Sequence, residues 1–168
     1  MLELEFLKKF PIFTGLSDEK INKIKSIMRE IEYPGGSVII RDGDRGEEMF
    51  ILLDGDVEIS KQMTIKMENY EASSKDKSLL RLSSKFHACF GEMALFEEKS
   101  ERSATVSAVN KCKLAIMSSQ DFSKLVDSDF EIGTIVFRNL ARIISERLKR
   151  ANKDILKLTT AFVLAVEK

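Results

Sequence analysis

The stretch FGEMALFEEKSERSATV, residues 90–106, is the most informative part of this chain of 168 residues. A glycine and a carboxylate open an apolar run, and an arginine follows the carboxylate ten positions later. Glycine lets backbone N–H groups come close to a ligand, and the N-terminal end of a helix favours an anion. Arginine adds a planar pair of donors that matches two phosphate oxygens. This order of residue types therefore predicts a site for an anion, with a phosphate as the best match.

The same stretch resembles the phosphate-binding cassette of cyclic nucleotide-binding domains, the family of the catabolite activator protein and the regulatory subunits of cAMP-dependent kinase. The resemblance covers roughly residues 5–150. It implies that Arg102 binds the cyclic phosphate, that Glu92 accepts the ribose 2′-hydroxyl, and that Ser103 reaches the phosphate or the base. Small side chains would leave room for the sugar. The expected ligand-binding residues are Gly91, Glu92, Met93, Ala94, Arg102, Ser103, Ala104 and Arg147.

The choice of base stays open. The resemblance implies a lid position for Arg147, where its side chain can stack on the base or donate hydrogen bonds to it. Arginine suits the O6 and N7 acceptors of guanine, but bacterial cAMP binders also have serine at the place of Ser103. We therefore expect cAMP or cGMP as the ligand, with a larger nucleotide or a dinucleotide as the alternative. A simpler interpretation of Arg147 is a solvated helix residue, and Arg102 alone would suggest a surface ion pair with a glutamate of residues 97–101.

The sequence on both sides of this stretch predicts a mainly β domain with flanking helices. Short apolar runs separated by turns, such as those at 42–44 and 54–56, are typical of a sandwich or a rolled barrel. With the resemblance, we expect a double-stranded β-helix, which is a jelly-roll-like β-roll, with short N-terminal helices and a long C-terminal helix. The expected strands are residues 38–40, 49–53, 57–59, 79–82, 105–108 and 114–116.

Helices precede the strands. Residues 2–9 combine apolar and charged side chains in a helical pattern that Pro11 ends. Ser17 is expected to cap a second helix, which continues until the turn-forming residues 33–36. Between the central strands, residues 68–77 are polar and show no periodicity. We therefore expect an exposed hairpin loop at 68–77.

The chain closes with one long helix. Ser118 and Ser128 each begin a capping box, which predicts a helix start. Apolar residues then recur at spacings of three and four, and this pattern predicts a helix with one apolar seam. We divide the chain into N-terminal helices and a cyclic-nucleotide-binding β-roll at 1–127, and a lid or dimerisation helix at 128–168. The seam consists of Phe137, Leu140, Ile144, Leu148, Ala151, Ile155, Leu158 and Phe162.

An apolar seam on a helix is expected to pack against another surface. We expect a C2 homodimer through paired C-terminal helices; a separate effector protein, or packing of the seam against the domain itself, are the alternatives. The 27 basic and 27 acidic residues balance, so no long-range field would gather nucleic acid or an anionic membrane. The basic residues of the last helix fit a solvated face better than a DNA-reading surface. We expect no DNA-binding domain and no direct DNA binding.

Other function classes find no support in the sequence. No apolar run approaches the roughly 18 residues that a membrane helix needs, so we expect no membrane insertion. The two cysteines, Cys89 and Cys112, lack the spacing of a metal or redox motif, and the first residues lack a targeting signal. A cytoplasmic location is therefore expected. Because no nucleophile and base form a known arrangement, we expect neither an enzyme nor a cofactor or metal.

The sequence thus predicts a sensor or regulatory module that binds a cyclic nucleotide and transmits this binding through its C-terminal helix. The alternative is a ligand-free structural or protein-docking module that keeps the same fold.

Overall fold

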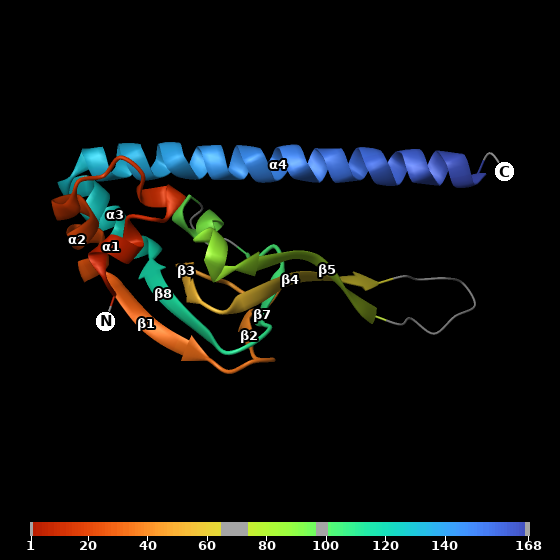
Figure 1. The fold of residues 1–168 in the computed structure, drawn as a ribbon, viewed down its shortest axis with the longest axis horizontal. Coiled ribbons are helices and arrows are strands. Elements are labelled where there is room, and N and C mark those ends of the chain that lie inside the picture. The colour runs from red at the N-terminus through yellow and green to blue at the C-terminus, as the bar shows by residue number, and fades with distance from the viewer. Residues whose placement is uncertain (1, 65–73, 97–100, 167–168) are drawn as a thin grey trace.

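The computed structural model describes residues 2–64, 74–96 and 101–166, and Figure 1 shows their arrangement. Strands occupy the middle of the chain and helices both of its ends. The helices are α1 (Leu4–Leu7), η1 (Pro11–Phe13), α2 (Asp18–Ser26), η2 (Ser84–Phe86), η3 (Glu92–Leu95), α3 (Ser119–Ser128) and α4 (Phe130–Val166). The strands are β1 (Met28–Tyr33), β2 (Val38–Ile40), β3 (Glu48–Asp54), β4 (Asp56–Thr64), β5 (Ser74–Ser83), β6 (Cys89–Phe90), β7 (Thr105–Ala108) and β8 (Cys112–Ser118).

Two antiparallel sheets form the body of the domain, with the strand orders β1-β8-β3-β6 and β2-β7-β4-β5. The residues of strand β3 show that the first sheet has one hydrophobic core on each face. Met49 and Ile51 belong to the core beneath the helices, whereas Phe50 and Leu52 belong to the core between the sheets. Successive side chains of a strand point to opposite faces. Both faces of β3 are therefore buried, which explains its continuous apolar run.

This architecture confirms the predicted fold class. The domain is mainly β, with short helices before the strands and one long helix after them. The two facing antiparallel sheets are the jelly-roll-like arrangement that the sequence predicts.

The second predicted helix is too long. Helix α2 ends at Ser26, and the next residues form β1. Strand β1 pairs with β8, where Ile31 lies opposite Leu114. Lys113 also forms an ion pair with Glu30 of β1. Pairing with β8 therefore outweighs the helical pattern of the local sequence, and the predicted helix over residues 28–33 is wrong.

Two further expectations need correction. Strand β5 begins at Ser74, so residues 74–77 are strand rather than loop, while residues 68–73 of the predicted loop lie outside the described residues. The Ser118 hydroxyl accepts a hydrogen bond from the backbone N–H of Asp121 at 3.0 Å, so this predicted cap is confirmed. Ser128 instead ends α3 and donates its hydroxyl to the Leu125 carbonyl. The predicted cap at Ser128 is wrong.

The first turns of α4 are anchored to the N-terminal helices. Asn139 is buried, and its side-chain amide donates to the carbonyls of Ile12 at 3.0 Å and Thr14 at 2.8 Å. At the α3–α4 junction, the Asp129 carboxylate pairs with Lys20 at 2.8 Å, and this hydrogen bond lowers the pKa of Asp129. These contacts hold the start of α4 in place.

The seam of α4 divides into two parts. Leu140 is fully buried against the helices, and Phe137 packs beside it. From Leu148 to Val166 every residue is exposed, and Phe162 keeps 68% of its surface accessible. The alternative of packing against the domain itself therefore holds for the first part only. Figure 1 shows α4 running along one side of the molecule and past helices α1 to α3. Among the described helices, none is both long and apolar enough to cross a membrane.

Candidate functional site

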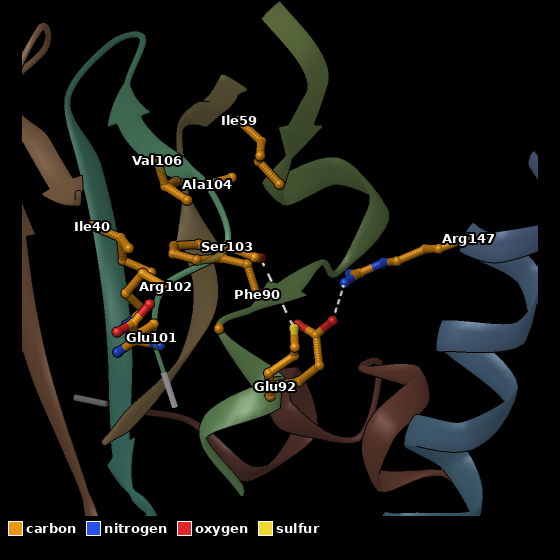
Figure 2. Close-up of a pocket in the computed structure, with 12 residues that line it drawn as sticks. Ile40, Ile59, Phe90, Glu92, Glu101, Arg102, Ser103, Ala104, Val106 and Arg147 are labelled. Atoms are coloured by element: carbon orange, nitrogen blue, oxygen red, sulfur yellow. Dashed lines mark hydrogen bonds and ion pairs between the residues drawn. The ribbon is translucent and has the colours of Figure 1, made fainter. Parts of the chain in front are cut away.

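A cavity of about 110 Å³ lies between the second sheet, η3 and α4 (Figure 2). Its wall combines apolar side chains from several strands with charged side chains from three separate segments. The lining residues are Ile40, Ile59, Phe90, Gly91, Glu92, Met93, Glu101, Arg102, Ser103, Ala104, Val106 and Arg147.

Gly91 lies directly before η3 and forms part of the cavity wall. Its φ of +72° lies in the left-handed region, where side chains other than that of glycine are strained. The backbone N–H of Ala94 donates to the Gly91 carbonyl at 3.2 Å. Within the described residues, the N–H groups of Glu92 and Met93 make no hydrogen bond. These two groups are free to meet an acceptor.

Arg102 is held by the loop between β2 and β3. Its backbone N–H donates to the Asp44 carbonyl at 2.8 Å, and its own carbonyl accepts from the N–H of Gly43 at 2.8 Å. The side chain donates from Nη2 to the Glu48 carbonyl at 2.9 Å and lies over the Phe50 ring. Partial burial lowers the pKa of Arg102, although an arginine stays charged at neutral pH. Of the glutamates near it in sequence, those at 97 and 98 lie outside the described residues.

Arg147 connects α4 to the cavity. Its Nη1 lies 2.9 Å from Oε1 of Glu92, and its Nη2 donates to the Cys89 carbonyl at 2.6 Å. Only 13% of the Glu92 side chain and 30% of the Arg147 side chain are exposed. Figure 2 shows the Arg147 side chain projecting from the helix toward Glu92. Arg147 is therefore not a solvated helix residue, and the long helix reaches the site through it.

The structure brings most of the predicted site residues together. Gly91, Glu92, Met93, Arg102, Ser103, Ala104 and Arg147 line one cavity. Ala94 does not line it and is buried in the core instead. The Ser103 hydroxyl lies 3.9 Å from the Met93 sulfur inside the cavity.

The apolar part of the wall was not predicted. Ile40, Ile59, Phe90 and Val106 come from four strands, and Glu101 adds a further polar group. Alternation along each strand indicates that such residues share a face. It does not indicate which strands become neighbours. The pairing of β2, β7 and β4 brings Ile40, Val106 and Ile59 together, and Phe90 comes from β6 of the other sheet.

Neither Cys89 nor His87 lines the cavity. Burial raises the pKa of the Cys89 thiol to about 12, so this sulfur stays protonated and unreactive. His87, the only histidine of the sequence, does not line the cavity and packs edge-on against Phe10. Within the described ranges, no group of three or more His, Cys, Asp or Glu side chains could hold a metal ion. Two arginines, two carboxylates and a hydroxyl beside an apolar wall suit an anion that carries a sugar and a flat ring.

Comparisons with known proteins identify the family and several relatives of this chain. The family profile described as the cyclic nucleotide-binding domain matches residues 30–129. The chain is 27% identical to the cGMP-dependent protein kinase egl-4 of Caenorhabditis elegans over 123 residues, which are 73% of the chain and 15% of the kinase. It is 28% identical to the cAMP-dependent protein kinase regulatory subunit of Schizosaccharomyces pombe over 137 residues, which are 79% of the chain and 28% of that subunit.

A solved structure shows the same fold. The crystal structure of the catabolite activator protein of Thermus thermophilus superposes with a TM-score of 0.70 and 26% identity, over 89% of this chain and 63% of that one. The chain thus spans 15% and 28% of the two kinase relatives and less than two thirds of the activator protein. The family profile covers more than half of the chain and includes the whole candidate site except Arg147. This chain belongs to the family of cyclic nucleotide-binding domains.

Proposed function

We propose that this chain is a regulatory module that binds cAMP or cGMP in the cavity of Figure 2 and transmits the binding event through α4. The observation that carries the proposal is the convergence of Arg102, Glu92 and Ser103 on one cavity beside an apolar wall. Relatives named for cAMP and for cGMP both match the chain, so the base stays open between the two. The role is binding rather than catalysis.

Each polar group of the cavity has a part in this proposal. Arg102 would hold the cyclic phosphate, assisted by the free N–H groups of Glu92 and Met93 and by the Ser103 hydroxyl. The Glu92 carboxylate would accept the ribose 2′-hydroxyl. Gly91 and Ala104 leave space for the phosphate and sugar, Ala94 keeps η3 close-packed, and Arg147 would contact the base.

The Glu92–Arg147 ion pair gives the ligand a direct connection to α4. A cavity of about 110 Å³ is smaller than the roughly 300 Å³ at which small-molecule pockets begin, so a nucleotide needs more room. Arg147 and the ribose would also share the Glu92 carboxylate. Binding therefore favours a state in which Arg147, and α4 with it, has shifted. A ligand moves such an equilibrium by its difference in affinity for the two states.

The output segment is the helix from residue 128 onward. The exposed half of its seam supports a parallel C2 dimer, because Leu148, Ile155 and Phe162 recur every seven residues and Ala151 and Leu158 fall between them. A separate effector protein on the same face is the second possibility. Both cysteines are free and buried, which supports a reducing, cytoplasmic setting.

Calorimetric titration tests the binding proposal. We expect the purified chain to bind at least one of cAMP and cGMP with a dissociation constant on the order of micromolar. The acyclic nucleotides 5′-AMP and 5′-GMP are the controls, since each keeps its base and ribose but loses the cyclic phosphate. We expect them to bind roughly tenfold more weakly or worse. If neither cyclic nucleotide binds at millimolar concentration, the chain is the ligand-free docking module instead.

Sedimentation equilibrium tests the dimer. We expect Leu158→Glu to weaken dimerisation roughly 100-fold, because two buried leucines are lost per dimer at about 1.5 kcal/mol or more each. Thr160→Glu is the control, since it adds the same charge away from the seam. A wild-type chain that stays monomeric at about 100 μM, a concentration typical of weak association, contradicts the dimer. Equal dimer affinity with and without bound nucleotide contradicts transmission through the paired helices.

A further inference from the structure

Gly46 lies in the loop between β2 and β3, in direct contact with the guanidinium of Arg102. A Cβ atom built on Gly46 would overlap three atoms of that group, Nε, Cζ and Nη2. The φ of Gly46 lies outside the left-handed region, so this angle does not require glycine. The contact with Arg102 gives a reason for glycine at this position.

The same guanidinium has two further neighbours, Gly91 and Phe50. A Cβ atom on Gly91 would lie 3.0 Å from Nη1, and the Phe50 ring centre lies 5.8 Å from Cζ. Nη2 donates to the Glu48 carbonyl, whereas Nη1 makes no hydrogen bond within the described residues. The hydrogen bond to Glu48 and the Phe50 ring thus orient Arg102, and Nη1 remains as a donor beside Gly91.

We propose that Gly46 is a positioning residue for Arg102, and that its missing side chain provides the space in which the phosphate-binding guanidinium is preorganised. An arginine side chain loses rotamer entropy when it becomes ordered, so an arginine ordered in advance loses less of it when the ligand arrives. Any side chain at position 46 would push the guanidinium off the Glu48 carbonyl. This inference rests on the proposed binding of a cyclic nucleotide.

A double-mutant cycle tests the proposal on the intact chain. We expect Gly46→Ala to weaken binding of the preferred cyclic nucleotide roughly tenfold in the wild-type background. In the Arg102→Ala background the guanidinium is gone, and the same substitution should change affinity less than about twofold. Equal losses in both backgrounds would overturn the proposal, because the effect would then not pass through Arg102.

A second measurement needs no nucleotide. The Nε–H signal of Arg102 in the NMR spectrum of the free protein is assigned by its loss in Arg102→Ala. We expect Gly46→Ala to shift this signal and speed its exchange with water, and an unmoved signal overturns the proposal. If wild type binds neither cAMP nor cGMP, the proposed function fails, while this signal still decides the role of Gly46.

Folding of the variants is also informative. Should Gly46→Ala prevent folding while Gly46→Ala with Arg102→Ala folds, overlap with Arg102 is the cause and the proposal stands. If both variants fail to fold while Arg102→Ala alone folds, the loop itself needs glycine at position 46, and the proposal is wrong.

Discussion

Replacing Arg102 with alanine is expected to weaken cyclic nucleotide binding about 100-fold. A charge-assisted hydrogen bond contributes about 1.5–3 kcal/mol, and each 1.4 kcal/mol changes affinity tenfold. The partial burial of Arg102 beside Phe50 places the loss in the upper part of this range, because water cannot fully replace the guanidinium. Calorimetric titration of the variant with cAMP and with cGMP measures the effect.

Two variants make this result specific. Arg142→Ala removes the same charge from an exposed position of α4 and should leave affinity within about twofold. Arg102→Lys keeps the charge but loses the planar pair of donors, so we expect a loss of roughly tenfold. An Arg102→Ala variant that binds as tightly as wild type would place the phosphate elsewhere.

Gly55→Ala is expected to lower the free energy of unfolding by about 3 kcal/mol. Gly55 has a φ of +87° in the turn between β3 and β4, and this left-handed conformation costs another residue roughly 1–2 kcal/mol. A Cβ atom there would also lie 2.5 Å from the Lys111 carbonyl oxygen and 2.8 Å from Oδ1 of Asn110. Crowding of this kind adds about 1–3 kcal/mol, because the backbone cannot move aside. Unfolding in urea measures the difference.

Gly36→Ala separates the two causes. Gly36 has a φ of +82°, close to that of Gly55, but a Cβ atom at this position would meet no described atom within 4 Å. We therefore expect this variant to lose only the conformational part, roughly 1–2 kcal/mol. Equal losses in the two variants would mean that the turn before β4 relaxes around the added methyl group.

The sequence predicts the fold best where residues close together in the chain determine the structure of an element. The apolar run of β3 and the cap at Ser118 depend on residues close together in the chain, and both were predicted correctly. Strand β1 was missed because its structure depends on β8, more than 80 positions away, through pairs such as Ile31 with Leu114. Local periodicity contains no information about such a partner.

In the candidate site, residues that are close in sequence were likewise predicted together, whereas contacts between residues far apart in sequence were not predicted. Gly91, Glu92, Arg102 and Ser103 lie within one short stretch, so their order was enough to predict a common site. The pairing of Glu92 with Arg147 joins residues 55 positions apart and depends on where α4 crosses η3. The contact between Gly46 and Arg102 likewise exists only in the folded chain. Residue types predict which side chains can contact a ligand. The fold determines which of these side chains contact one another in the free protein.

Because the first half of α4 is anchored and the second half is exposed, a small tilt of the helix near the cavity would produce a larger displacement at its end, as in a lever. Its fulcrum lies near Arg147, the last residue of the helix that is partly buried, and its free arm extends to Val166. Fifteen residues separate Arg147 from Phe162, which corresponds to about 22 Å of helix. A tilt of about 10° at the fulcrum thus moves Phe162 by roughly 4 Å, which is more than half the rise of one helical turn. In the proposed dimer, a shift of this size at Phe162 would change which residues of the paired helices meet.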